Sequence, residues 1–374
     1  MRRETLAPRP DWPARCEALG FRFHHVDGQP YWNEAACYRF TAAEIDALEE
    51  AADALHGLCL EALDWAVEND RLAPFGIPAE WHGAVKASWR AREPSLYGRF
   101  DLCFDGGGPP KLLEYNAETP TALMEAAVVQ WQWLEEVAPA ADQFNFIHEA
   151  LVDAWRAIPA GGPVHLACLR GSAEDAGTIE YMADAAAQAG HETRLLYVDE
   201  IGWQAAAGRF VDREDRPIGT LFRLYPGEMM LADEGAANLA TAGIRLIEPL
   251  WKLPLSSKGL LSLLWHLFPD HPNLLPAFHD PAPLGGSFVA KPLYGREGAN
   301  LTMVQDGRTV LETPGPYGGG GFVFQALQPL PVFEGRHALV GAWIVGGKAC
   351  GIGMREDSGP ITSNSSRFVP HLFE

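Results

Sequence analysis

Two short stretches of the chain carry side chains whose types and spacing suit the binding of a metal ion and a phosphate. Arg99 and Asp101 stand two residues apart in the first stretch, and Glu114 and Asn116 stand two residues apart in the second. Residues 105–110 between them are rich in glycine and proline, which is typical of a hairpin loop. Because strand side chains alternate between faces, each pair shares one face of its strand. A hairpin would therefore bring one arginine and three oxygen donors within reach of one another.

The pairing of the two strands decides which side chains meet. A symmetric hairpin with Phe104 opposite Lys111 sets Asp101 opposite Glu114. Two carboxylates in that position repel each other and destabilise a sheet. A hard cation between them reverses the sign of the interaction, and a set of Asp, Glu and Asn oxygens suits Mg²⁺. The sequence therefore predicts Asp101, Glu114 and Asn116 as ligands of one magnesium site.

Arg99 faces Asn116 in the same register, and its planar guanidinium group suits a phosphate. The alternative is a solvated strand face on which the acids and the arginine form ordinary salt bridges. Charge clusters of this kind mark functional sites only as a tendency. On the hairpin alone, both interpretations stay open.

The composition is that of a globular protein with an acidic balance. The 374 residues are 47% hydrophobic and 21% charged, and 29 Lys and Arg against 49 Asp and Glu give a formal net charge of −20. The length predicts two or three lobes rather than a single core. The negative charge argues against nucleic acid or an anionic membrane as a partner. It is compatible with a cationic substrate, although an acidic surface also serves solubility.

The cysteines and the N-terminus predict a reduced, cytoplasmic protein. The six cysteines are scattered without a CxxC pair, and no apolar segment of a signal peptide follows residues 1–5. No window approaches the roughly 20 apolar residues of a membrane span.

Helices are predicted around the hairpin. Thr41 and Glu44 form a capping box, and apolar residues continue at helical spacing to about Asn69. The stretches 121–136 and 142–156 are typical of two further helices. Their tryptophans are expected in the core: Trp131, Trp133 and Trp155.

From about residue 163 to residue 249 the pattern is that of a βαβ unit. It comprises a strand, a helix and a strand, at 164–169, 176–189 and 193–198. Ligands of such sheets bind beyond the carboxyl ends of the strands, where this chain has Glu174 and Asp175. These acids are candidates for substrate contact. The equal alternative is a helix N-cap at Ser172 with acids that the helix dipole favours.

The C-terminal part predicts a site for nucleotide phosphates. Lys291 ends a strand, and the glycine-rich turn 295–300 that follows could cover phosphates with its backbone N–H groups, although it lacks the Walker spacing. Residues 318–321 are expected to be a flexible loop tip and residues 322–327 a buried strand. The polar, arginine-containing tail 351–368 predicts an ordered site for a phosphate or a carboxylate.

Together these motifs resemble the synthetase part of glutathionylspermidine synthase, an ATP-grasp-like carboxylate–amine ligase. The matching stretches occur in order over nearly the whole chain: 97–101, 112–121, 142–145, 248–252, 274–276, 291–300, 355–357 and 366–371. The resemblance implies an α/β (α+β) fold of three units. Residues 1–160 hold an N-terminal helical segment and the metal-binding hairpin as part of the ATP-grasp-like body. Residues 161–249 form a small doubly wound substrate lobe (pre-ATP-grasp), and residues 250–374 form the nucleotide-binding lobe.

The resemblance also implies ATP and Mg²⁺ as cofactors and a role for each matching residue. Asp101, Glu114 and Asn116 correspond to the magnesium ligands. Arg99 would steady the transferring phosphoryl group, and Arg355 would lie near the acyl phosphate. The implied nucleotide contacts are Arg99, Lys258, Lys291, Gly298, Gln325, Ala326, Leu327, Gln328 and Thr362. The implied peptide and polyamine contacts are Thr119, Glu174 and Asp175, and the charge of a polyamine makes Glu228 a further candidate.

The implied reaction joins two small molecules. ATP phosphorylates a carboxylate, in the family the glycine end of glutathione, and an amine of spermidine attacks the acyl phosphate. Glu174, Asp175 or the acyl phosphate itself could take the amine proton. Residues 225–230 have glycine and methionine where tryptophans are expected, which leaves the identities of the acid and the amine open. Bifunctional members carry an amidase domain ahead of the synthetase, and since this chain begins at the synthetase, amidase activity is not expected.

The main alternative is a nucleotide-binding protein without ligase activity that acts as a regulator or partner. The complete set of arginine, lysine and carboxylate residues argues against this alternative, because an idle site has no chemical need for all of them. The sequence does not indicate an oligomeric state.

Overall fold

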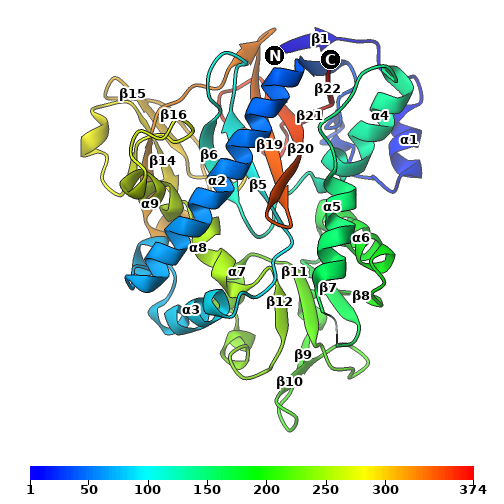
Figure 1. The fold of residues 1–374 in the computed structure, drawn as a ribbon, viewed down its shortest axis with the longest axis vertical. Coiled ribbons are helices and arrows are strands. Elements are labelled where there is room, and N and C mark those ends of the chain that lie inside the picture. The colour runs from blue at the N-terminus through cyan, green and yellow to red at the C-terminus, as the bar shows by residue number, and fades with distance from the viewer. Residues whose placement is uncertain (160) are drawn as a thin grey trace.

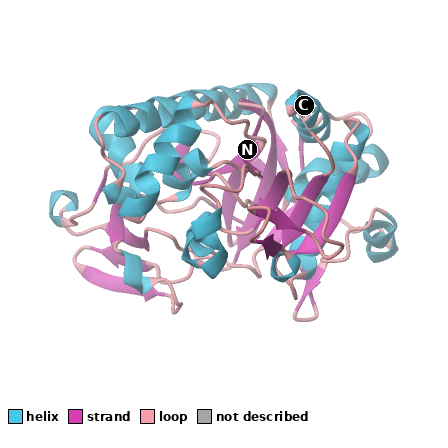
Figure 2. Ribbon diagram, turned by 90° about the horizontal axis from the view of Figure 1, so that it is seen from below, coloured by secondary structure: helices cyan, strands magenta, loops and turns pink. Residues whose placement is uncertain are grey.

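Sheets of six, five and four strands carry the fold (Figure 1). A computed structural model describes residues 1–159 and 161–374. Figure 2 shows a long helix along the upper edge of the molecule, with strands below it and further helices at several places around them. The predicted α/β class is therefore confirmed.

The six-stranded sheet contains the predicted hairpin. Its strands, in spatial order, are β21 (Arg367–Val369), β20 (Lys348–Asp357), β19 (Arg336–Val345), β5 (Tyr97–Cys103) and β6 (Lys111–Asn116), and β18 (Val332–Phe333) pairs with β19. All of these pairs are antiparallel. Strands from the first and last thirds of the chain thus share one sheet. Strand β19 is the neighbour of the hairpin in this sheet, and β6 is an edge strand.

The long helix α2 (Ala42–Glu68) packs on β19 and β20 and crosses the six-stranded sheet in Figure 1. Its capping box is formed as predicted, since Thr41 accepts a hydrogen bond from the Glu44 amide and the Glu44 side chain accepts one from the Thr41 amide. Leu48, Leu55 and Leu63 are buried on its inner face. This apolar face fixes the helix to the sheet.

A five-stranded antiparallel sheet provides the second half of the site. Its order is β13 (Ala277–Phe278), β17 (Phe322–Ala326), β14 (Phe288–Pro292), β15 (Thr302–Gln305) and β16 (Arg308–Glu312). Helix α9 (Gly259–Leu267) packs on β13 and β17, and α8 (Leu253–Ser256) contacts α9 and β6. The glycine-rich turn joins β14 to β15, as the sequence predicts. Residues 318–320, expected as a flexible tip, form a short 3₁₀ turn.

The predicted βαβ unit is present in a parallel four-stranded sheet. Its order is β12 (Arg245–Ile247), β11 (Thr220–Leu224), β7 (Val164–Cys168) and β8 (Thr193–Tyr197). Helix α6 (Ala173–Gln188) connects β7 to β8 and packs against α5 (Ile147–Ala157). The predicted boundary at residue 160 lies outside the described residues, and the division into three units stays a prediction.

Smaller elements complete the chain. Strands β1 (Arg2–Thr5), β4 (Ala36–Phe40) and β22 (His371–Phe373) form one sheet, and β2 (His25–Val26) with β3 (Gln29–Pro30) and β9 (Gly202–Gln204) with β10 (Arg209–Val211) form two ribbons. The remaining helices are α1 (Trp12–Ala18), α3 (His82–Arg90), α4 (Gln130–Val137) and α7 (Gly227–Ala232), with a π-helical turn at Glu125–Val129. In the described part of the chain, none of the helices combines the length and apolarity that a bilayer crossing demands.

Two predictions about the helices after the hairpin were wrong in detail. The second helix begins at Ile147 rather than at residue 142, because Asp142 and Asn145 bridge to Phe373 and Gly351 instead. Trp131 is not a core residue: it is 40% exposed, since it lies on the outer face of α4. The other two tryptophans, Trp133 and Trp155, are buried as predicted.

Candidate active site

The hairpin pairs its polar side chains in the predicted register. Asp101 lies opposite Glu114, and Arg99 lies opposite Asn116. The expected pairing of Phe104 with Lys111 is wrong, because a bulge between Asp101 and Leu102 shifts the loop end of the hairpin by one residue. Cys103 is the residue that faces Lys111. A bulge of this kind leaves one residue unpaired and re-aims the neighbouring side chains.

Positive side chains offset the repulsion between the two carboxylates. The guanidinium group of Arg99 donates to both oxygens of Asp101, with N–O distances of 2.7 and 3.1 Å. The ammonium group of Lys258 lies 3.1 Å from Glu114. Burial alone would raise the pKa of Glu114, but the charges of Lys258 and Lys291 outweigh it and lower this pKa to about 2. Glu114 is therefore ionised at neutral pH.

Asp101 responds in the opposite direction. Its burial, opposed by Arg99, raises the pKa of this carboxyl. The two acids therefore differ in proton affinity although they share one site. Asn116 donates to Glu114 at 3.4 Å and completes the polar face of the hairpin.

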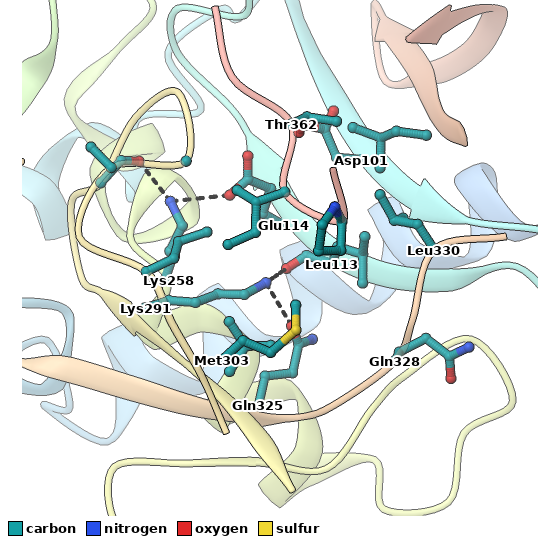
Figure 3. A pocket seen from close by; sticks show the side chains of 18 of the residues that line it. Asp101, Leu113, Glu114, Lys258, Lys291, Met303, Gln325, Gln328, Leu330 and Thr362 are labelled. Atoms are coloured by element: carbon teal, nitrogen blue, oxygen red, sulfur yellow. Dashed lines mark hydrogen bonds and ion pairs between the residues drawn. The ribbon is translucent and has the colours of Figure 1, made fainter. Parts of the chain in front are cut away.

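Lys258 and Lys291 extend toward the hairpin from the five-stranded side (Figure 3). Lys258 donates to the Gly295 carbonyl at 2.7 Å. Lys291 donates to the Leu113 carbonyl at 2.8 Å and to the Gln325 side chain at 2.7 Å. Burial lowers the pKa of Lys291 to about 8, against the opposing charge of Glu114. A phosphate beside this lysine would favour its charged form.

These residues line one cavity of about 110 Å³. Most of the predicted metal and nucleotide residues are on its wall: Asp101, Glu114, Lys258, Lys291, Gly298, Gln325, Ala326, Gln328 and Thr362. The predicted residues Arg99, Asn116, Leu327 and Arg355 are not on the wall. Arg99 and Asn116 still touch residues that are, through Asp101 and Glu114.

Sequence reasoning missed the apolar part of the cavity wall. Leu113, Met303, Leu330 and Leu339 face the same space from four different segments. An apolar surface beside Gln325 and Gln328 suits the flat ring of a nucleotide base. Strand alternation places these side chains on a face, but it does not tell which face meets the cavity.

The glycine-rich turn closes against the C-terminal tail. Gly298 has φ = 70°, and a Cβ at this position would lie 2.6 Å from the Thr362 carbonyl oxygen and 2.7 Å from the Ile361 side chain. Glycine is required here for both its conformation and its size. Arg355 donates to the Ser363 carbonyl in the same tail. Turn and tail together form one side of the cavity.

A second polar cluster lies beside the cavity, and Arg296 of the glycine-rich turn is its central residue. Arg296 donates to the Thr119 hydroxyl at 3.0 Å and to Glu228 at 2.6 Å. The predicted substrate residues Thr119 and Glu228 are thus brought together. Arg296 itself was missed as a site residue, although it stands within the glycine-rich turn that the sequence singled out.

The other two predicted substrate residues lie at the start of α6. Ser172 caps this helix by accepting a hydrogen bond from the Asp175 amide. The predicted alternative of a helix N-cap therefore describes the role of Ser172. Burial, followed by the charge of Glu125, raises the pKa of Glu174 to about 8. Burial also raises the pKa of Asp175. The cap does not use the Glu174 side chain, so this carboxyl stays a candidate for substrate contact.

The donor set of the hairpin fits a magnesium ion. Asp101 and Glu114 present opposed carboxylates on the cavity wall, and Asn116 adds an amide oxygen. Such all-oxygen sets suit hard cations, which usually take their other ligands from water and nucleotide phosphates. In residues 1–159 and 161–374, no group of three His, Cys, Asp or Glu side chains could hold a metal by itself.

Comparison with known proteins finds relatives along nearly the whole chain. The family described as "Glutathionylspermidine synthase preATP-grasp" matches residues 3–374. A Haemophilus influenzae protein whose name places it among the acid–amine ligases is 40% identical over 392 residues, with 100% of each chain covered. The Escherichia coli bifunctional glutathionylspermidine synthetase/amidase is 31% identical over 367 residues, which cover 89% of this chain and 58% of that protein.

Solved structures support the predicted ATP-grasp-like fold. A glutathione synthetase-like effector of Globodera pallida has a TM-score of 0.59 at 10% identity, with 97% of this chain and 96% of that chain covered. At this identity the likeness concerns the fold alone. With the family match over residues 3–374, it confirms the predicted resemblance. The chain belongs to the glutathionylspermidine synthase family.

Proposed function

We propose that the protein uses ATP and Mg²⁺ to join a peptide-like carboxylate to an amine through an acyl phosphate. The observation that carries this proposal is the opposition of Asp101 and Glu114 on a cavity wall that also holds Lys258 and Lys291. Phosphoryl transfer needs positioning and neutralisation of oxygen charge more than covalent chemistry. Family membership supports the class of the enzyme, an ATP-dependent carbon–nitrogen ligase.

Each residue has a distinct task in this proposal. Asp101, Glu114 and Asn116 would hold Mg²⁺, which supplies Lewis-acid neutralisation of the transferring phosphoryl group. Lys258 and Lys291 would contact nucleotide phosphates in place of the Gly295 and Leu113 carbonyls. The nucleotide base would lie between the apolar wall and the segment 325–328. Arg99 and Arg355 would act on the acyl phosphate.

The glycine-rich turn would exclude water. An acyl phosphate hydrolyses when water reaches it, so a cover over the intermediate protects the product. The contact of Gly298 with Thr362 supports this role, since it lets turn and tail meet closely.

Glutathione and spermidine are the first substrates to test, because the family includes enzymes named for them. Glu174, Asp175, Glu228 and Thr119 would contact them. A carboxyl with a pKa of about 8, like that of Glu174, can exchange a proton with an amine near neutral pH. The packing around segment 225–230 explains why it has a glycine at position 227. A Cβ on Gly227 would lie 2.3 Å from Leu253 and 2.6 Å from Glu118. A bulky side chain at this position would not fit.

The test is ADP release, measured for a set of acids crossed with a set of amines in the presence of Mg²⁺. One acid–amine pair is expected to release ADP only when both partners are present, and Asp101→Asn should abolish that release. Glu50→Gln, on the exposed face of α2, is the matched control that should keep it. Turnover of another acid–amine pair would support ligase activity and rule out glutathione and spermidine as the substrates. Binding of ATP without ADP release for any pair would favour the alternative, a nucleotide-binding protein that acts as a regulator or partner.

A further inference from the structure

A buried ion pair lies at the open end of the hairpin, away from the loop. Glu248 and Lys252 are 0% and 2% exposed, and their charged groups lie 3.5 Å apart. Neither residue is on the cavity wall described above. The sequence motif 248–252 contains both, and the proposed reaction gives neither a task.

The pair connects the ends of the two hairpin strands. Glu248 accepts hydrogen bonds from the amides of Leu96 and Tyr97, at 2.9 and 3.1 Å. Lys252 donates to the carbonyls of Tyr97 and Ala117, at 3.0 and 3.2 Å. Pairing of β5 with β6 ends at Arg99 and Asn116. Lys252 therefore bridges the two strands just beyond their last paired residues.

The position of this bridge relates it to the metal and phosphate residues. Tyr97 lies two residues before Arg99, and Ala117 directly follows Asn116. Without a bridge at this end, the distance between β5 and β6 would be free to vary at Arg99 and Asn116. The other end of the hairpin is displaced by the bulge and is held separately, since Gln325 donates to the Leu112 carbonyl at 2.9 Å.

Stability alone does not explain a buried ion pair at this place. Desolvation of two charges costs several kcal/mol, and apolar residues often replace such pairs without loss of stability. Burial lowers the pKa of Lys252, which Glu248 opposes. A charged bridge with directed hydrogen bonds instead fixes geometry, because an ammonium group has three donors and needs its acceptors at set distances.

We infer that Lys252, oriented by Glu248, is a positioning residue that sets the spacing of Asp101, Glu114 and Asn116 for Mg²⁺–nucleotide binding. This inference rests on the proposed function and adds a residue that touches neither ligand. It predicts that loss of the pair weakens Mg²⁺-dependent binding more than metal-free binding. Residues that orient metal ligands typically contribute about 10- to 100-fold in affinity.

The test uses the double variant Glu248→Gln/Lys252→Met. The Gln side chain keeps an oxygen for the amides of Leu96 and Tyr97, and no single charge stays buried, so folding is expected. Calorimetry with a non-hydrolysable ATP analogue, with and without Mg²⁺, gives the metal-dependent part of binding. We expect this part to fall on the order of 10-fold, with metal-free binding unchanged. Lys252→Arg keeps the charge and the donors, so it should keep more of the Mg²⁺-dependent binding than the double variant does.

Asp212→Asn is the matched control, since Asp212 is a buried partner of Arg216 and His165 in the region of the parallel sheet. It should lower the melting temperature and leave Mg²⁺-dependent binding unchanged. The same outcome for the double variant would overturn the inference. Failure of both Lys252 variants to fold would also count against it and assign the pair to stability alone. A wild-type protein that binds no Mg²⁺–nucleotide would instead overturn the proposed function.

Discussion

Single residues carried most of the predictable chemistry. Asp101 and Glu114 could be identified because two acids at that spacing need a partner, and the structure supplies Arg99 and Lys258. Residues such as Arg296 escaped prediction because their partners come from other segments of the chain. Residue types therefore indicate a kind of chemistry, whereas contacts between distant segments decide which residues share in it.

Asn116→Ala tests the metal site at one position. Asn116 is only half-buried and makes one long hydrogen bond, at 3.4 Å to Glu114, so loss of its amide should cost stability no more than about 1 kcal/mol. Mg²⁺-dependent nucleotide binding should weaken at least about 10-fold. Calorimetry beside thermal melting separates the two effects. Wild-type metal dependence in this variant would remove Asn116 from the ligand set.

Glu174→Gln tests the half-buried carboxyl of Glu174 in α6 by its pH dependence. The pKa of Glu174 is raised from 4.5 to about 8, so the folded protein keeps a proton that the unfolded chain releases. This contribution to stability is complete below pH 4.5 and is lost as the pH rises through 8. The variant should therefore gain stability relative to wild type between pH 5 and 8, by at most about 1.4 kcal/mol per pH unit.

The comparison of variant with wild type is needed because buried His56 and His371 have lowered pKa values and shift stability in the opposite direction. Their contributions cancel in the difference between the two proteins. Denaturant melts from pH 5 to 8 measure this difference in the free energy of unfolding. Glu180→Gln, at an exposed position of the same helix, should show a flat difference. A flat difference for Glu174→Gln as well would show that this carboxyl is ionised in the folded protein.

At the scale of elements, local pattern located helices and strands but not their irregularities. The capping box of α2 and the βαβ unit were predictable because their signals lie within a few residues. The hairpin bulge was not, since it lies between Asp101 and Leu102, where the sequence has no turn residue to mark it. The same holds for the start of α5, where bridges to distant strands displace the first predicted turn.

Gly298→Ala tests the contact between the glycine-rich turn and the tail. A Cβ there would lie 2.6 Å from the Thr362 carbonyl, in a backbone conformation that L-residues rarely adopt. The turn should no longer seat against the tail, and the KM for ATP should rise several-fold while the fold persists. Gly319→Ala is the control, because a Cβ at Gly319 meets no atom within 4 Å. Equal KM values for both variants would contradict closure at this contact.

At the scale of the whole molecule, Mg²⁺–ATP should stabilise the protein, because the cavity draws its walls from both the six-stranded and the five-stranded sheets. A ligand at 100 times its Kd adds about 2.7 kcal/mol to the free energy of unfolding. Thermal-shift titration should therefore show a rise in melting temperature that needs both Mg²⁺ and ATP. Lys291→Met should remove most of the shift. No shift in the wild type at millimolar ligand would contradict the ligase.

The arrangement of whole sheets was the least predictable level. The sequence indicated the hairpin of β5 and β6, but not that β19 is its neighbour or that β4 lies between β1 and β22. The pairs β5–β19 and β4–β22 join residues more than two hundred positions apart, and no local signal encodes a partner at that distance. The resemblance to a known family indicated the fold class, but it did not supply this strand order.

The pairing of β5 with β19 has a consequence for the order of events during synthesis. About 220 residues separate the end of β6 from the start of β19, and ribosomes add roughly 5–20 residues per second. The nascent hairpin therefore exists for on the order of ten to forty seconds with one edge open and two acids opposed. Lys258 and Lys291, which neutralise them in the folded protein, are added only in the second half of this interval. The proposed nucleotide site can therefore be completed only after most of the chain has left the ribosome, late in translation.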